Sequence, residues 1–178
     1  MIRLLAISGS LRAISTNTTL LKAARMLAPE GVRIELYDGL AGLPHFNPDL
    51  DVEPPPPAVA AWREAVRAAD GLLISSPEYA RGVPGSLKNA FDWLVSSDAF
   101  PAKPVAFFHA SDRGTVSRAA LRLILETMAA RIVDEAEITL PLLGRQTSVA
   151  DVAANAEFVA IIGTALAAFA RSVAVEPV

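Results

Sequence analysis

The chain has 178 residues, a formal net charge of −3 at pH 7 and no cysteine. This length suits one domain with a full-sized core, and an apolar content of 52% argues against a disordered chain. The lack of cysteine excludes disulfides, thiolate metal ligands and cysteine nucleophiles, and it is consistent with a reducing cytoplasm. Because acidic and basic residues are interspersed, we expect no nucleic-acid partner.

Apolar runs and helical stripes alternate without an internal repeat or an interdomain linker, so we expect a single domain over residues 1–178. In chain order the expected elements are strand 3–8, helix 18–28, strand 32–38, helix 58–69, strand 69–77, helix 86–97, strand 103–111, helix 115–130, strand 131–141 and helix 149–173. Strand followed by helix, five times over, predicts an α/β fold with a parallel sheet and helices on both faces.

The most apolar late stretch is FVAIIGTALAAFA, residues 158–170, which Glu157 and Arg171 bracket. It is shorter than the ~20 residues that a transmembrane helix needs. We therefore expect a buried core helix here and no membrane partner.

Three loops of the predicted fold are candidate ligand sites. A parallel sheet binds ligands outside the carboxyl ends of its strands, where the strand order reverses. The loops that follow the first, third and fourth strands, 9–17, 77–85 and 110–114, should therefore face one site.

The first of these loops reads GSLRAISTN and leads into a helix. A helix N-terminus offers unpaired N–H groups and a partial positive charge, so it favours an anion. The loop lacks the lysine of a P-loop and does not read GxGxxG, so a transferred phosphate and a Rossmann dinucleotide site are disfavoured. Hydroxyls, one amide and Arg12 suit a terminal phosphate monoester such as that of FMN. The alternative is that Ser and Thr here only cap the helix.

The stretch SPEYARGVPGSLKNAFDWL, residues 76–94, follows the third strand. Backbone groups at 77–82 would lie open at the sheet edge, where a planar ring could meet them, and Tyr79 offers an aromatic wall. Glu78 has no evident acid–base partner, so an N-terminal or interface ion pair is the simpler interpretation. For Trp93 we expect packing in the core or between subunits rather than cofactor stacking.

The sequence contains no recognisable catalytic or metal-binding set. His45 lies in a proline-containing loop, and His109 lies at a strand end without a second histidine nearby. No Ser-His-Asp set or carboxylate pair is visible, so we expect no catalytic side chain and no metal ligand.

With these motifs at this spacing, the chain resembles the NADPH-dependent FMN reductase family of quinone, chromate and azo-dye reductases. The resemblance runs from residue 2 to about residue 140 and includes LPHFNPDLD at 43–51. It implies a flavodoxin-like three-layer sandwich with a five-stranded parallel sheet in the order 2-1-3-4-5. It also implies bound FMN, NADPH or NADH as co-substrate, a small electron acceptor, and a homodimer or homotetramer. The cofactor-binding residues that it implies are Gly9, Ser10, Arg12, Ser15, Asn17, Thr18, Pro77, Glu78, Tyr79, Ala80 and Ser111.

Two departures from the family pattern affect the expected function. Ala80 stands where the family commonly has Asn, and the loop HASDRGTVS keeps only Gly114 where the family is glycine-rich. We expect an FMN-dependent NAD(P)H oxidoreductase in which the flavin performs the chemistry. The alternatives are a flavodoxin-type electron carrier and a flavin-free assembly module that retains the fold.

Overall fold

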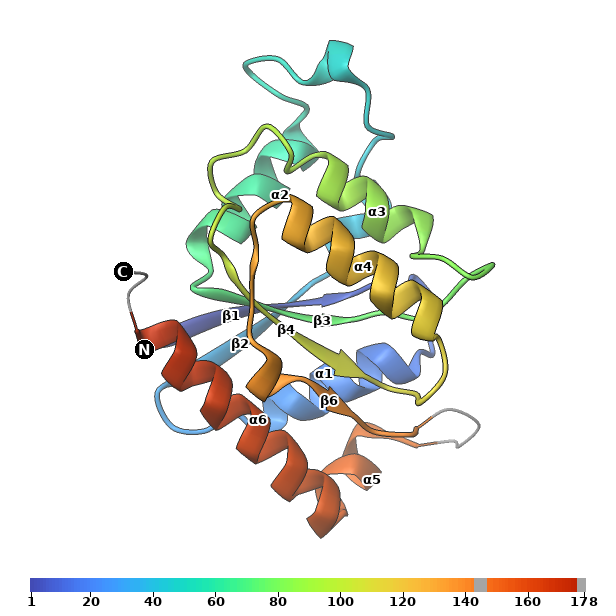
Figure 1. Ribbon diagram of the computed structural model, residues 1–178, viewed down its shortest axis with the longest axis vertical. Helices are drawn as coiled ribbons and strands as arrows, with labels where there is room; N and C mark the ends of the chain where they lie inside the picture. Colours follow the sequence, from blue (N-terminus) through green and yellow to red (C-terminus); the bar gives the residue numbers. More distant parts are fainter. Residues whose placement is uncertain (143–146, 176–178) are drawn as a thin grey trace.

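The computed structural model describes residues 1–142 and 147–175 and is built around a parallel sheet (Figure 1). The strands run in the order β2-β1-β3-β4-β5, with β6 also paired to β4, and every pairing is parallel. The predicted sheet order is therefore confirmed. The strands are β1 (Ile2–Ser8), β2 (Val32–Tyr37), β3 (Gly71–Ser75), β4 (Pro104–His109), β5 (Arg131–Ile132) and β6 (Ile138–Thr139).

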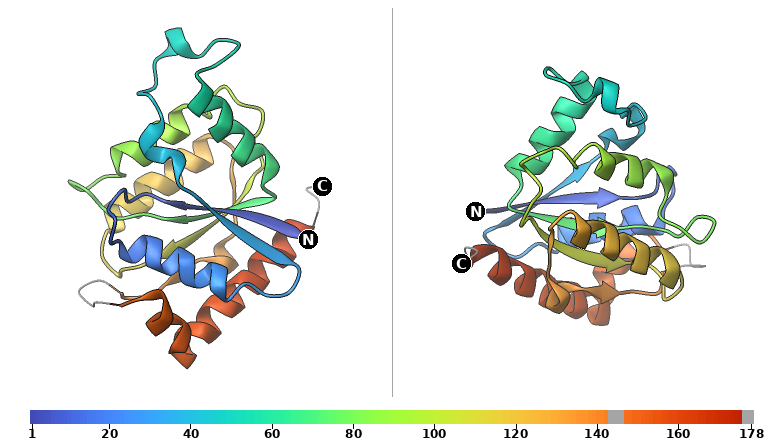
Figure 2. Two further views of the ribbon diagram at one scale, coloured as in Figure 1. Left: turned by 180° about the vertical axis from the view of Figure 1, so that it is seen from behind. Right: turned by 45° about the horizontal axis from the view of Figure 1, so that its top comes forward.

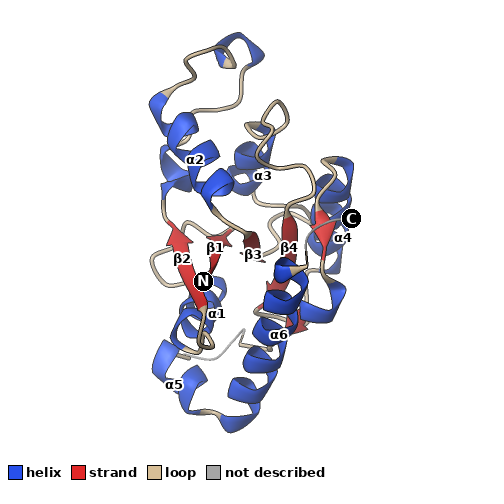
Figure 3. Cartoon of the chain, turned by 90° about the vertical axis from the view of Figure 1, so that its left-hand side faces the viewer, coloured by secondary structure: helices blue, strands red, loops and turns tan. Residues whose placement is uncertain are grey.

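Helices cover both faces of the sheet, as Figures 2 and 3 show. One layer holds α2 (Pro57–Ala68), α3 (Gly85–Asp92) and α4 (Thr115–Thr127). The opposite layer holds α1 (Thr16–Met26), α5 (Val149–Ala154) and α6 (Ala156–Ala174). The three-layer architecture expected from the alternation is thus confirmed.

Two hydrophobic cores follow from the period of two along each strand. In β1, Leu5 and Ile7 face the layer of α2, α3 and α4, whereas Leu4 and Ala6 face α1 and α6. In β3, Leu72 and Ile74 join the first core and Leu73 joins the second. Because both faces are covered, the strands read as continuous apolar runs.

The C-terminal third differs from the expectation. The single strand predicted over 131–141 is two short strands, β5 and β6, separated by a 3₁₀ turn over Asp134–Ala136. The single helix predicted over 149–173 is divided at Asn155, whose side chain accepts a hydrogen bond from Phe158 N (3.1 Å) and caps α6. β6, α5 and α6 pack on the second core, whereas Ile132 of β5 packs against the first.

Two other helix boundaries depart from the prediction. The first helix begins at Thr16 rather than Thr18, because Ser15 caps it. The third helix ends at Asp92 rather than at residue 97. There Arg63 Nε donates to the carbonyl of Trp93 (2.9 Å), which satisfies an acceptor at the helix end. Trp93 itself is fully buried, so its expected core position is confirmed.

The segment between β2 and α2 projects from the molecule (Figure 1) and contains two 3₁₀ turns, Gly39–Gly42 and Pro48–Leu50. It is nevertheless anchored, because the carbonyl of Pro44 accepts hydrogen bonds from Asn89 Nδ2 (2.9 Å) and Trp93 Nε1 (2.8 Å). Its prolines exclude regular helix and central strand.

Among the described residues, α6 is the one helix long and apolar enough to cross a membrane. Ile162, Leu166 and Phe169 on one side of α6 are fully buried against the sheet. This packing places one face of the apolar stretch in the core, and 22% of the helix's most apolar 18-residue window is buried.

Candidate functional site

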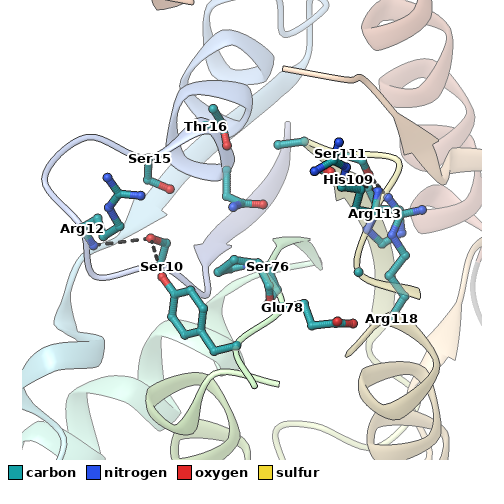
Figure 4. Close-up of a pocket in the computed structure, with 15 residues that line it drawn as sticks. Ser10, Arg12, Ser15, Thr16, Ser76, Glu78, His109, Ser111, Arg113 and Arg118 are labelled. Atoms are coloured by element: carbon teal, nitrogen blue, oxygen red, sulfur yellow. Dashed lines mark hydrogen bonds between the residues drawn. The ribbon is translucent and has the colours of Figure 1, made fainter. Parts of the chain in front are cut away.

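A cavity of about 330 Å³ lies at the carboxyl ends of β1, β3 and β4. Figure 4 shows residues of the β1–α1 loop facing residues of the β4–α4 loop, with Ser76 and Glu78 between them. Three loops that are far apart in the sequence therefore meet at the carboxyl ends of the strands, where the strand order predicts a ligand site. The predicted site residues that line the cavity are Ser10, Arg12, Ser15, Asn17, Pro77, Glu78, Tyr79 and Ser111.

Gly9, Thr18 and Ala80 lie outside the cavity lining. A Cβ on Gly9 would come within 2.5 Å of Ser76 Oγ and 3.0 Å of Leu87 Cδ2. Glycine at this position therefore lets the loop after β1 approach the loop after β3 closely. Thr18 Oγ1 is hydrogen-bonded to Ser8 Oγ (2.8 Å) beside a neighbouring groove. Ala80 is exposed at the tip of a turn.

The N-terminus of α1 opens into the cavity. Ser15 is its N-cap, and Ser15 Oγ accepts a hydrogen bond from Thr18 N (3.4 Å). Within the described residues, the amides of Thr16 and Asn17 have no hydrogen-bond acceptor. The helix-capping role of Ser15 and an open anion site therefore coexist, because one cap satisfies only one of the unpaired amides.

Asn17 is fixed by a buried contact with the neighbouring strand. Ser75 Oγ donates to Asn17 Oδ1 (3.0 Å), and both residues are buried. An amide whose oxygen is engaged in this way presents its Nδ2 donors in the remaining directions. Asn17 is thus oriented as a donor at the cavity wall.

Tyr79 connects the loop after β3 to the loop after β1. Its Oη is hydrogen-bonded to Ser10 Oγ (3.4 Å), which also accepts from Arg12 N (3.4 Å), as drawn in Figure 4. The Tyr79 side chain keeps 47% of its surface exposed. The aromatic wall predicted at this position is present, and it stands at the cavity mouth.

A tight turn follows Tyr79. Tyr79 and Gly82 exchange both backbone hydrogen bonds (3.1 and 2.9 Å), and Ala80 and Arg81 between them have φ of 48° and 58°. Type I′ turns need positive φ at both central residues and favour Asn and Gly there. Neither residue is of that kind, so the turn holds backbone strain beside the cavity.

Glu78 is committed to the N-terminus of α4. Its Oε2 accepts a hydrogen bond from Ser117 N (2.9 Å), and Ser117 Oγ donates to the carbonyl of Pro77 (3.3 Å). The helix begins after Gly114, which has φ of 85° and no side chain to act as a cap. Glu78 thus supplies the missing anion at a helix N-terminus, where the sequence suggested an N-terminal or interface ion pair.

The β4 side of the cavity contributes side chains that the sequence did not single out as site residues. Arg118 hydrogen-bonds the carbonyl of Ser111 and Thr139 Oγ1. His109, at the end of β4, pairs through Nε2 with Glu137 Oε1 (2.9 Å). Burial, followed by the charge of Arg118, lowers the pKa of His109 below its ordinary value of 6.5, although Glu137 opposes the shift.

These residues had only weak signals in the sequence. His109 lies at a strand end, as its position in the sequence indicates, but its partner Glu137 is 28 residues away. Arg118 lies inside a helical pattern and reads as surface charge. Cavity-lining residues absent from the predicted set are Thr16, Ser76, His109, Ala110, Arg113, Gly114 and Arg118.

The charge balance of the cavity favours an anionic ligand. Arg12, Arg113 and Arg118 line it, while Glu78 is already bound to the α4 backbone. Free amides, hydroxyls and guanidinium groups on the α1 side form a donor set for a phosphate group. The aromatic ring of Tyr79 and the backbone after β3 offer a border for a planar group.

Comparison with known proteins finds reductases at the level of the family, of the sequence and of the fold. A family model described as NADPH-dependent FMN reductase matches residues 2–142. An NAD(P)H-dependent FMN reductase of Pseudomonas aeruginosa is 46% identical over 112 residues, which cover 62% of this chain and only 60% of that protein. A quinone reductase of Escherichia coli is 33% identical over 143 residues, or 76% of each chain. FerB of Paracoccus denitrificans, a flavoenzyme NAD(P)H:(acceptor) oxidoreductase, shares the fold with a TM-score of 0.72, at 21% identity over 96% of this chain and 98% of that one.

Proposed function

The chain belongs to the NADPH-dependent FMN reductase family, and from this premise we propose that it is an FMN-dependent NAD(P)H oxidoreductase. Its electron acceptor is a small molecule such as a quinone, an azo compound, a metal oxyanion or free flavin. The observation that carries the proposal is the open N-terminus of α1 at a cavity that the loops after β3 and β4 complete.

The donor set of this chain fits FMN. The free amides of Thr16 and Asn17, together with the Ser10 hydroxyl, can satisfy the oxygens of an ester phosphate. Arg12 adds a positive charge without a lysine that would assist phosphate transfer. Pro77, Glu78 and Tyr79 then border the ring, while Ser111 faces it from the β4 side.

Bound FMN supplies the hydride chemistry, so the side chains act by position and charge. Two titratable groups of the cavity wall are already engaged, Glu78 with Ser117 N and His109 with Glu137. The hydrogen bond between Tyr79 and Ser10 holds the loops after β1 and β3 together at the cavity mouth. The arginines make the cavity attractive to a phosphorylated co-substrate.

An absorbance spectrum of the purified protein, before and after anaerobic addition of NADPH, tests the proposal. We expect a flavin band that bleaches with NADPH and returns when a quinone is added. A flavin band that NADPH and NADH leave unchanged would favour a flavodoxin-type carrier. A colourless protein that does not take up added FMN would support the flavin-free module and overturn the proposal.

We also propose self-association at the cavity mouth. Leu11, Ile14 and Tyr79 expose 55%, 85% and 47% of their surface on loops next to the cavity. Isolated exposed apolar residues are ordinary, but a group beside a ligand site suits an interface between two copies. Light scattering should give a dimer or tetramer for the wild type and a smaller species for Ile14→Asp. A monomeric wild type would contradict this proposal.

The cytoplasm is the proposed location. The lack of cysteine and the packing of one face of α6 in the core support it. Cell fractionation with an antibody to the full chain would test it, and recovery in the membrane fraction would contradict it.

A further inference from the structure

A second depression, which we name the basic groove, lies beside the cavity where β1 and β2 end. It has a volume of about 490 Å³, and the residues that define it here are Arg12, Lys22, Arg25, Tyr37, Asp38 and Leu40. Ser10 and Arg12 line both the basic groove and the cavity. The two are therefore neighbouring parts of one sheet edge, with the β1–α1 loop between them.

The cations of the basic groove are not used by the fold. Within residues 1–142 and 147–175, the side chains of Arg12, Lys22 and Arg25 make no ion pair or hydrogen bond. Elsewhere the fold does pair its arginines, as in the contact of Arg63 with Asp51 (2.8 Å). Asp38 is the one carboxylate among the described residues that line the groove.

Two of the cations in the basic groove are neighbours on one helix. Lys22 and Arg25 are three residues apart on α1, so their side chains are neighbours that repel each other. The groove also contrasts with the net charge of −3 of the whole chain. An anion with more than one charge would relieve the repulsion.

The remaining lining suits a flat apolar group. Leu36 lines the groove from the α1 side of the sheet, whereas Tyr37 and the buried Leu40 pack with the opposite core and line the groove where β2 ends. The Tyr37 ring packs on Trp62 with ring centroids 4.6 Å apart, which fixes its position. Cations beside an apolar and aromatic wall fit a phosphorylated nucleoside, with the base on the wall and the phosphate on the cations.

The width of the sheet edge that carries both sites suits a dinucleotide. From β2 to β4 the sheet crosses three strand spacings, or ~14 Å. We propose that the basic groove binds the 2′-phosphoadenosine end of NADPH while its nicotinamide end lies in the cavity, so that Lys22 and Arg25 make the protein prefer NADPH to NADH. This inference rests on the proposed function, because it names how the co-substrate of the same site is selected.

Isothermal titration of the FMN-loaded protein with adenosine 2′,5′-bisphosphate, and with ADP for comparison, tests the groove without any turnover. We expect the wild type to bind the 2′-phosphorylated nucleotide about ten-fold more tightly, and Lys22→Gln/Arg25→Gln to lose this preference. In steady-state assays the ratio of the KM for NADPH to the KM for NADH should rise about ten-fold in that variant.

Arg33→Gln/Arg171→Gln is the matched control, because it also removes two positive charges but alters neither site. We expect it to keep the preference for the 2′-phosphate. Equal binding of the two nucleotides by the wild type, or an equal loss in the control, would overturn the inference. A protein whose flavin is not reduced by either co-substrate contradicts the proposed function instead, and the titration still reports on the groove.

Discussion

Two helices, α1 and α4, begin at the same cavity, and their N-termini are treated differently. At α4 the cap residue is Gly114, and the carboxylate of Glu78 reaches across from the β3 loop to accept a hydrogen bond from Ser117 N. At α1 the cap is the neutral Ser15, and the loop GSLRAISTN contains no carboxylate. One helix end is capped by the protein's own anion, and the other carries only a neutral cap.

The difference teaches how a fold selects one of two similar ends for a ligand. Both ends carry the same unpaired amides and the same partial charge, so each could hold an anion. An internal carboxylate at α4 removes that end from competition and stabilises the helix. The free amides of Thr16 and Asn17 leave α1 for an external phosphate.

The largest expected effect comes from removing side-chain donors at the N-terminus of α1. Ser15→Ala/Asn17→Ala removes two donor groups and should raise the Kd for FMN about 100-fold or more, because hydrogen bonds to charged groups contribute ~1.5–3 kcal/mol each. Fluorescence titration of the apoprotein with FMN measures this. Adding Ser75→Ala avoids leaving the Ser75 hydroxyl buried without its acceptor.

Ser148→Ala is the control for this change, since Ser148 caps α5 by a similar contact with Asp151 N (3.1 Å) but lies outside the cavity. It should lower stability while FMN affinity stays as in the wild type. Unchanged FMN binding in Ser15→Ala/Asn17→Ala would show that the phosphate site is not at α1.

Opening the filled end should have the next largest effect. Glu78→Ala leaves α4 without its cap and should lower the free energy of unfolding by about 1–2 kcal/mol in urea titrations. Glu78→Gln keeps a neutral acceptor and should lose less. Millimolar sulfate should restore part of the stability of Glu78→Ala, because the freed amides can bind it; equal stability of all three proteins would refute the capping role.

The turn that follows Glu78 allows a smaller change. Arg81→Gly should raise the free energy of unfolding by up to ~1 kcal/mol, because strain of ~1–2 kcal/mol at positive φ exceeds the added backbone entropy of glycine. Arg81→Ala keeps the strain and is the control. If both variants gain equally, the benefit comes from removing the charge and not from the backbone.

The smallest expected effect is a pH dependence on the α4 side. Because burial and Arg118 lower the pKa of His109, the unfolded chain binds a proton at this residue more readily than the folded protein. The stability is therefore full above pH 6.5, the ordinary histidine value, and falls as the pH drops from there through the lower folded pKa. Urea midpoints between pH 7.5 and pH 5 should decline less in His109→Asn than in His45→Asn, and identical declines would contradict this origin.

Much of the site could be predicted because it depends on neighbours in the chain. A strand end followed by GSLRAISTN marks the α1 terminus, and SPEYARG marks the loop after β3. The prediction was wrong where it made one strand of residues 131–141 and one helix of residues 149–173. Asp134 and Glu135 interrupt the strand alternation and Asn155 is a helix N-cap residue, but both breaks lie inside longer apolar stretches that favoured one continuous element.

The sequence by itself determined the order of strands and helices, the two apolar faces of each strand and the position of the polar loops, because these follow from side-chain periodicity along a single segment. Only the tertiary structure decided that the carboxylate of Glu78 caps α4 rather than α1. Glu78 reaches Ser117 across 39 residues, Gly9 makes room for Ser76, and Lys22 lies along one groove with Tyr37. Such contacts depend on how layers pack and how loops approach at the sheet edge, which local pattern does not specify.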